Sequence, residues 1–280
     1  MSWIELKNIS IEELAKTRKQ IHQAAQLPAI TGRCLNPKDS GDAFAALYWD
    51  NEQNVLSSQP WEKSSFRSIL SISDFELVII EEKKGSNDSF KLNGKTYDEA
   101  FNWLKEKLNS LGFKGDKLNK SQPYQIPEYP TAKGEPFKQI NNATFTELQN
   151  YFSNAAFVLE NLMTKQKGAS EVLCWPHHFD IATLITIEKN PDPEKTKTIG
   201  VGLSPGDESY NEPYFYVSPW PYPENKNDVL KLDHGHWHDK GWFGGVLTAT
   251  EIIKQKDKSK QLKIAEIFIE TAIHNLKNLL

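Results

Sequence analysis

The order of helical and strand-like segments constrains the fold of this chain more than any single motif does. In the earlier half, residues 10–27 have apolar side chains at helical spacing after a capping pattern, Ser10 followed by Glu13. Strand-like stretches follow at 43–49, 55–59 and 66–81, where aromatic and β-branched residues alternate with polar ones. A second helical pattern covers 97–108. The first helix is expected to end before Pro28, because proline disrupts a helix interior.

The later half repeats this order. A helical pattern begins near Thr144, and another closes the chain at 259–279. Between them lie four strand-like stretches, at 172–188, 198–203, 213–218 and 242–250. Sequential strands with short connections form antiparallel meanders, whereas a parallel sheet needs helices between its strands. The sequence therefore predicts an α+β fold with two helix-flanked antiparallel sheets, built from a pseudo-duplicated helix/strands/helix unit.

A proline-rich stretch separates the two halves. Residues 114–137 contain four prolines together with several Gly and Lys residues, a composition typical of an extended connector. We therefore expect an α+β half at 1–113, a connector at 114–137, and a second α+β half at 138–280 that carries the candidate site.

Charge and composition exclude several classes of protein. The 37 acidic and 33 basic residues give a net charge of -4, which provides no basic field for nucleic acid. No apolar run approaches the ~20 residues that span a bilayer, and the two cysteines, Cys34 and Cys174, suit a reducing compartment. The expectation is a cytoplasmic protein that binds neither nucleic acid nor membrane, with a small molecule as its candidate partner and an oligomeric state that the sequence leaves open.

Histidines are concentrated in the later half, where five of the seven lie between residues 177 and 238. If the chain is extended near Trp175, His178 and Asp180 lie on one face, where the carboxylate can ligate a metal or hold the ring in one tautomer. The alternative is that Asp180 caps backbone N–H groups and the histidine rings pack on Trp175. The remaining two histidines, His22 and His274, lie in helical patterns and are expected to be ordinary surface or boundary residues.

A second histidine segment has three imidazoles at alternate positions, His234, His236 and His238. On a strand these side chains project to one side, and histidine is a common nitrogen ligand of zinc. Together with His178 they are the candidate metal ligands, for zinc or another divalent ion. The alternative is a polar surface loop that binds nothing.

Tyrosines and tryptophans gather beside these segments. Tyr214, Tyr216 and Trp220 follow a turn-rich loop, and with Trp175 they are the candidate ligand-binding residues, because rings with a polar edge suit stacking on a planar or sugar ligand. A packed sheet edge or a subunit contact is the alternative. Glu212, at the end of the loop, is with Asp180 a candidate catalytic base.

Three of these motifs resemble a bacterial family of proteins of unknown function. They are Phe179-Asp180-Ile181-Ala182, the turn at 202–206 followed by Pro213-Tyr214-Phe215-Tyr216, and the segment 241–247. Their order matches throughout the later half. The resemblance implies that Asp180 and Tyr216 are site or fold residues, and it implies no activity. The histidine segments have no fixed counterpart in the family pattern.

Two hypotheses from different classes therefore remain open. One is a protein that handles a small molecule in a cleft of the later half, with a divalent-metal-dependent hydrolase as its catalytic form. The other is a non-catalytic ligand-binding or assembly protein that uses an aromatic groove. The sequence does not decide whether the protein is an enzyme.

Overall fold

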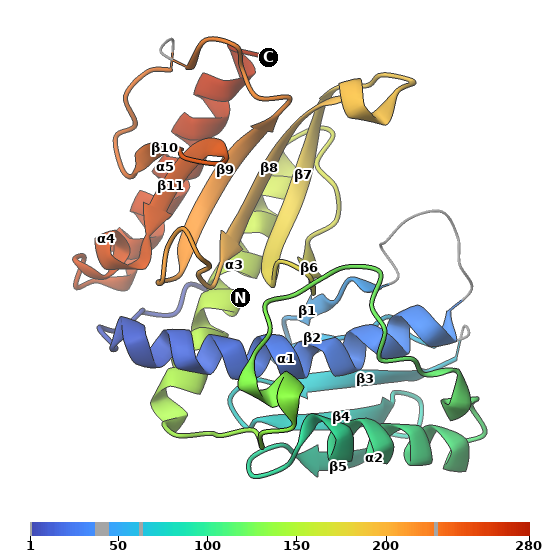
Figure 1. The fold of residues 1–280 in the computed structure, drawn as a ribbon. Coiled ribbons are helices and arrows are strands. Elements are labelled where there is room, and N and C mark those ends of the chain that lie inside the picture. The colour runs from blue at the N-terminus through green and yellow to red at the C-terminus, as the bar shows by residue number, and fades with distance from the viewer. Residues whose placement is uncertain (1, 37–44, 62–63, 227–228) are drawn as a thin grey trace. The chain divides into compact units, whose positions relative to one another are not determined.

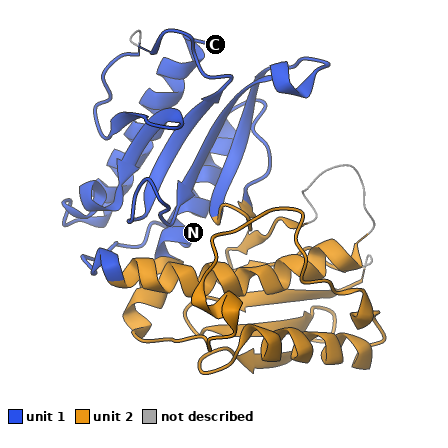
Figure 2. Cartoon of the chain, viewed as in Figure 1, with its two compact units in different colours: residues 1–12, 150–173, 180–280 blue, residues 13–149, 174–179 orange. Residues whose placement is uncertain are grey.

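The structure is a computed structural model, and it describes residues 2–36, 45–61, 64–226 and 229–280. Residues 43–44 of the strand expected at 43–49 lie outside the described residues. By its internal contacts the chain divides into two compact units (Figure 2). The five-stranded unit comprises residues 13–149 and 174–179, and the six-stranded unit comprises residues 1–12, 150–173 and 180–280. The whole segment expected to be a connector, 114–137, belongs to the five-stranded unit.

The five-stranded unit contains an antiparallel meander. Its strands follow chain order and are β1 (Tyr48–Asp50), β2 (Val55–Ser57), β3 (Phe66–Ser71), β4 (Glu76–Glu81) and β5 (Ser86–Lys91). The single stretch expected at 66–81 is thus a hairpin, which turns at Phe75 with φ 51°. Helix α2 (Tyr97–Ser110) begins with a capping box in which Thr96 and Glu99 satisfy each other's backbone N–H groups.

Helix α1 (Ile11–Leu35) is longer than the sequence predicts. The expected end before Pro28 is wrong, because the helix continues through this proline. Residues 21–32 of the helix are all buried, so tertiary packing stabilises the turn that loses a backbone hydrogen bond at Pro28. The hydroxyl of Thr31 donates to the Pro28 carbonyl at 2.8 Å.

The proline-rich segment packs within the five-stranded unit and contains two 3₁₀ helices, η2 (Gly115–Lys117) and η3 (Pro130–Lys133). Its tyrosines bond to α1: Tyr124 donates to the side-chain oxygen of Gln26 at 3.1 Å, and the hydroxyl of Tyr129 lies 2.8 Å from Nδ1 of His22.

The second antiparallel sheet has the order β10-β11-β9-β8-β7-β6, and its strands belong to the six-stranded unit except for Cys174 and Trp175 of β6. These strands are β6 (Leu173–Trp175), β7 (Asp180–Glu188), β8 (Lys197–Ser204), β9 (Tyr214–Trp220), β10 (His236–Asp239) and β11 (Phe243–Thr248). A short 3₁₀ helix, η4 (Pro193–Lys195), lies between β7 and β8. The α-helices are α3 (Asn142–Lys165), of which residues 150–165 belong to this unit, α4 (Ala249–Ile253) and α5 (Lys258–Lys277).

Helices cover one face of this sheet. Figure 1 shows α3 and α5 on the same side of it, and α5 contacts β8, β9 and β11. Side chains that point to this side, such as Phe215, Val217 and Phe268, are fully buried. Trp3 from the first residues of the chain also packs here, stacked on Phe215 at 6.4 Å between ring centroids. Side chains of the opposite face are therefore the ones free to form a site.

The predicted fold class is confirmed: the structure is α+β, with antiparallel sheets of five and six strands. Both cysteines are free thiols. Within the described ranges, the structure contains no helix with the length and hydropathy needed to cross a membrane.

Candidate functional site

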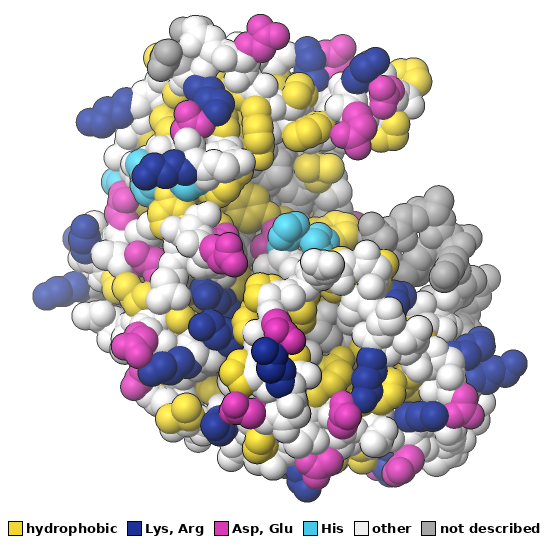
Figure 3. Space-filling view, in the orientation of Figure 1, with side chains coloured by type: hydrophobic (Ala, Val, Ile, Leu, Met, Phe, Trp, Pro, Cys, Tyr) yellow, Lys and Arg dark blue, Asp and Glu magenta, His cyan; other side chains and the backbone are white. Residues whose placement is uncertain are grey.

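The face of the six-stranded sheet opposite α5 carries tyrosines and histidines. Residues paired across neighbouring antiparallel strands point to the same face. Tyr216 pairs with Gly202 on β8 and with Val246 on β11, and Val246 in turn pairs with His236 on β10. Tyr216 and His236 thus share one face, and Tyr214 shares it because it lies two residues from Tyr216 on β9. Figure 3 shows cyan histidine side chains beside yellow hydrophobic ones on the face of the molecule that it draws.

Tyr216 is held between a glycine and a carboxylate. A Cβ atom on Gly202 would lie 2.7 Å from both Cζ and the hydroxyl oxygen of Tyr216, so the ring lies directly on the glycine backbone. Beyond Gly202, the hydroxyl of Tyr216 donates a hydrogen bond to Oδ2 of Asp180 at the start of β7. Asp180 is buried to 9% exposure. The pair fixes the direction in which both polar groups point.

The hydroxyl of Tyr210 joins two imidazoles. It lies 2.8 Å from Nε2 of His236 and 2.9 Å from Nδ1 of His238. The Nε2 atom of His238 lies 2.9 Å from the carbonyl of Lys240, which can only accept, so this nitrogen carries the proton. In the neutral ring Nδ1 of His238 must then accept from Tyr210, and the Tyr210 oxygen accepts from Nε2–H of His236. The contacts therefore define one direction of donation along the chain His236, Tyr210, His238, Lys240.

Tyr214 is the most buried ring of this face. It is 4% exposed, and its hydroxyl donates to Oδ2 of Asp207 at 2.5 Å. Burial, followed by the hydrogen bond to the Asp207 carboxylate, raises the pKa of Tyr214 far above its usual value. The other carboxylate oxygen of Asp207 accepts from the backbone N–H groups of Ser209 and Tyr210. Asp207 thereby holds the loop that delivers Tyr210 to the sheet.

These rings form one cluster, which we call the aromatic cluster. Centroid distances between neighbouring rings run from 4.4 Å, for His238 and Trp242, to 6.4 Å, for Tyr214 with either Tyr216 or Trp242. Its members are Tyr210, Tyr214, Tyr216, His236, His238 and Trp242. Trp242 also lies over a glycine, because a Cβ on Gly244 would be 2.8 Å from its Cζ3 atom. Glycines in β8 and β11 thus make room for two of the rings.

The three alternate histidines do not all meet. His236 and His238 lie on one face as predicted, and a ring nitrogen of each contacts the hydroxyl of Tyr210. His234 precedes the strand, separated from it by Gly235 with φ 75°, and lies 3.9 Å from Glu251. A side chain on residue 235 would approach the Val246 carbonyl to 2.3 Å. The close approach of β11 therefore requires glycine here, and the left-handed turn breaks the alternation.

The predicted metal ligands do not form a recognisable metal centre. The point between His236 and His238 is filled by the Tyr210 hydroxyl. In the described part of the chain, no three or more His, Cys, Asp or Glu side chains converge as metal ligands would. His178 belongs to the five-stranded unit and His234, His236 and His238 to the six-stranded one.

The segment before β7 is a turn rather than an extended strand. The N–H of Phe179 donates to the Trp175 carbonyl at 2.7 Å, and Phe179 has φ 59°. The expected alternation, with His178 and Asp180 on one face, therefore does not apply, because it required extended backbone. The rings of His177 and His178 lie 4.3 Å apart. Trp175 belongs to the same unit as these histidines and lies 6.0 Å from the His177 ring, edge to face.

Two other predicted residues have structural roles. Glu212 accepts a 2.6 Å hydrogen bond from the backbone N–H of Thr250, in the first turn of α4. This bond satisfies a helix-end donor and occupies one oxygen of the candidate base. Trp220 is 43% exposed and donates to the Glu194 carbonyl at 2.9 Å. It lies six residues from Tyr214 along β9, roughly 20 Å at the rise of a strand, outside the aromatic cluster.

The sequence did not predict that Tyr210 and Trp242 belong to the site. It also did not predict that Asp207 holds the loop by accepting hydrogen bonds from Ser209, Tyr210 and Tyr214. The available signal was the run Asp207-Glu208-Ser209-Tyr210, because an Asp side chain often bonds to N–H groups two and three residues later. Such a turn at the end of β8 directs Tyr210 back over the sheet.

His22 is the clearest correction among the histidines. It was expected near the surface, but it is 4% exposed and stacks on Phe179 with ring centroids 5.0 Å apart. Its Nε2 lies 2.9 Å from the Pro176 carbonyl and must donate, so Nδ1 accepts from the hydroxyl of Tyr129. Burial lowers the pKa of His22 to about 4, against a weaker opposite effect of the Pro176 carbonyl. The ring is therefore neutral, and it joins α1 to the turn before β7.

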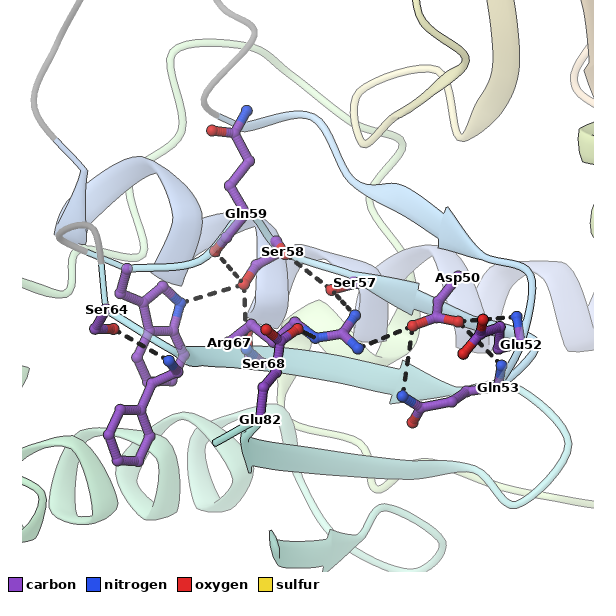
Figure 4. A network of polar contacts seen from close by, with 12 residues as sticks. Asp50, Glu52, Gln53, Ser57, Ser58, Gln59, Ser64, Arg67, Ser68 and Glu82 are labelled. Carbon is purple, nitrogen blue, oxygen red and sulfur yellow. Dashed lines mark hydrogen bonds and ion pairs between the residues drawn. The ribbon is translucent and has the colours of Figure 1, made fainter. Parts of the chain in front are cut away.

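Arg67 is the centre of a separate polar network in the five-stranded unit (Figure 4). Its guanidinium contacts Asp50 at 2.9 Å and Glu82 at 3.0 Å, and it donates to the hydroxyl of Ser57 at 2.8 Å. Burial raises the pKa of Asp50, but hydrogen bonds from the Gln53 N–H and Arg67 outweigh this effect, so the pKa is lowered overall. The guanidinium of Arg67 on β3 thus bonds to side chains of β1 and β2.

A family model matches residues 6–271 of this chain, nearly its whole length, and its description is a family of unknown function, DUF5996. The chain belongs to the DUF5996 family. The resemblance to a family of unknown function is therefore confirmed. No curated protein and no solved structure matches this DUF5996 chain significantly. The function of this family is unknown, so membership assigns no activity to the chain.

Proposed function

We propose that this DUF5996 protein binds a small organic ligand on the aromatic cluster, and that the ligand presents a planar or sugar ring with polar groups at its edge. The observation that carries the proposal is the hydroxyl of Tyr210, held between two imidazoles on the sheet face that carries the aromatic cluster. Aromatic side chains with fixed polar edges are the usual lining of sites for such ligands.

The cluster is held in place before any ligand arrives. Tyr214 and Tyr216 each donate to a carboxylate, and Tyr210 bonds to two histidines. Binding is weakened when side chains must be ordered at the same time, by about 0.5–1.5 kcal/mol for each flexible side chain. Rings already fixed by hydrogen bonds avoid this cost. His236 remains exposed, so part of the cluster is accessible to a ligand.

Binding is supported better than hydrolysis. Hydrolysis needs a base that can take a proton from water, yet Glu212 bonds to the start of α4 and Asp180 accepts from Tyr216. The two convergent histidine nitrogens contact a tyrosine hydroxyl rather than an open position. A metal-dependent reaction would require Tyr210 to leave this point.

The proposal is tested by ligand-observed NMR against a library of heteroaromatic fragments and monosaccharides. Trp242→Ala and Tyr210→Phe should abolish or weaken the saturation transfer that the wild type shows. Tyr222→Ala is the matched control, because Tyr222 is an exposed ring that packs on Trp220, outside the cluster. Binding that Tyr222→Ala reduces and Trp242→Ala does not would contradict the proposal, as would the absence of any fragment binding.

The metal content of the purified protein distinguishes the metal-dependent hydrolase from the proposed ligand-binding protein. Protein purified without a histidine tag, from cells supplied with zinc and iron, should contain less than about one tenth of an equivalent of metal. Stoichiometric metal that is lost in His236→Ala and His238→Ala would instead favour the metal-dependent form.

A further inference from the structure

A pocket unrelated to the aromatic cluster lies in the five-stranded unit. It has a volume of about 290 Å³, close to the lower limit for small-molecule sites. It is formed by the first half of α1, by Pro130 of η3, and by the segment leading into α3. Its lining residues are Glu13, Lys16, Thr17, Lys19, Gln20, Pro130, Lys138, Ile140, Asn141 and Thr144.

The floor of the pocket is polar and fixed. The hydroxyl of Thr144 donates to the Asn141 carbonyl at 2.8 Å, so Thr17, 2.6 Å away, donates to the Thr144 oxygen. Both threonines are buried. Gln20 is also held, because its side-chain oxygen accepts from the backbone N–H of Lys138 at 3.0 Å. These bonds join α1 to the opposite wall and maintain the shape of the pocket.

The rim carries a surplus of positive charge. Three lysines, Lys16, Lys19 and Lys138, line the pocket together with a single carboxylate, Glu13. Lys138 also forms an ion pair at 3.6 Å with Glu135, which is outside the lining. The amide of Asn141 donates to Glu13 at 2.9 Å. Within the described ranges, the side chain of Lys19 has no hydrogen bond or ion pair. Its ammonium group is therefore available to an anion from outside the chain.

Two of the lining residues are apolar. They are Ile140, which is 77% exposed, and Pro130. A ligand that covers Ile140 removes this apolar surface from water, which an inorganic ion cannot do. No arginine lines the pocket, and lysine acts as a point charge rather than a bidentate fork.

We propose that this pocket binds an organic monoanion with a short apolar body, of the medium-chain monocarboxylate class. The carboxylate contacts Lys19 and Lys138, and the apolar body lies against Ile140 and Pro130. This proposal does not depend on the function proposed for the aromatic cluster.

Octanoate is the probe for the test, with the methyl resonance of Ile140 as the reporter, assigned through Ile140→Val. Octanoate should shift this resonance saturably, whereas acetate and octylammonium should not, because the first lacks the apolar body and the second carries the wrong charge. The variant Lys19→Gln/Lys138→Gln should raise the dissociation constant at least fivefold. Lys114→Gln, an exposed lysine of the same unit outside the pocket, should leave it unchanged.

Three results would overturn the proposal. One is the absence of a saturable shift up to about 10 mM octanoate. The second is binding of octylammonium as tight as that of octanoate, which would remove the role of the lysines. The third is equal affinity in the double variant and the wild type, with the Ile140 resonance showing that both are folded.

Discussion

The ring of Tyr216 lies against the backbone of Gly202, where a Cβ atom would be 2.7 Å from the tyrosine hydroxyl oxygen. Gly202→Ala should therefore destabilise the protein by about 1–3 kcal/mol, the usual cost of overpacking. The same Cβ also meets the Ile181 carbonyl at 2.7 Å, so removing the ring in Gly202→Ala/Tyr216→Ala should relieve only part of the loss. Urea unfolding measures both changes. The control is Gly200→Ala on the same strand, whose Cβ would have ordinary contacts at 3.8 Å or more; equal losses at the two glycines would disprove the close approach at Gly202.

Stability should fall in mild acid because of His22. The folded pKa, about 4, lies below the unfolded value of 6.5, so the unfolded state takes up a proton first as the pH falls. The contribution of the neutral His22 ring to the free energy of unfolding is complete above about pH 7 and is lost as the pH falls from about 6.5 to 4. Between pH 7 and pH 5 the loss is about 2 kcal/mol.

The measurement is urea unfolding at both pH values, in the wild type and in His22→Gln. The variant removes the titrating group, so it should be less stable at pH 7 and should show a smaller difference between the two pH values. His274→Gln, at an exposed position, serves as the control and should behave as the wild type. An undiminished pH dependence in His22→Gln would show that other groups cause the acid sensitivity.

The hydrogen bonds of Tyr210 predict the tautomers of two histidines. Near pH 8.5, where an ordinary histidine is neutral, His236 and His238 should both carry the proton on Nε2, as long-range ¹H–¹⁵N spectra detect. In Tyr210→Phe the Nδ1 atom of His238 loses its donor and His236 loses its acceptor, so the ring resonances of both should move while those of His274 stay. A protonated Nδ1 in His238 of the wild type would contradict donation from Tyr210 to His238.

Arg67→Met should destabilise the protein by about 2 kcal/mol, because it leaves the part-buried Asp50 without its cation. The value is below that of a fully buried pair, since Glu82 is half exposed and partly solvated. Arg67→Lys keeps the charge but not the fork, and should recover only part of the loss. Denaturant unfolding measures whether stability falls in the expected order, from the wild type to Arg67→Lys to Arg67→Met. Lys133→Met removes a pair with Glu128 in which both side chains are exposed, and should cost under about 0.5 kcal/mol; a loss as large as that of Arg67→Met would reject the role given to burial.

Periodicity was sufficient to predict most of the fold. The alternation around Tyr214 and Tyr216 predicted β9 and the shared face of these rings, and the apolar stripe after Ser259 predicted α5. Pro28 misled the prediction of α1, because a local rule cannot include the packing that surrounds residues 21–32. The polar strand β5 was not predicted, since it is defined by its pairing with β4 rather than by its own composition.

The candidate site was only partly predictable. The sequence indicated that His236 and His238 share a face, but the residue between them, Tyr210, lies 26 and 28 positions earlier. Its position depends on the turn at Asp207 and on the strand register, neither of which is a periodic signal. Phe179 follows His178 and Gly235 follows His234, and both adopt positive φ. These two left-handed residues are the physical reason why alternation failed for His178 and His234.

The first residues of the chain close the six-stranded unit. Trp3 donates to the side chain of Gln261 on α5, and the N–H of Leu6 donates to the same oxygen. During synthesis these partners emerge 258 and 255 residues apart, so the opening segment has no partner on α5 until that helix has been translated. Residues 13–149, by contrast, are already available to fold. The two units are thus expected to mature in succession on the ribosome, with the docking of Trp3 among the last events.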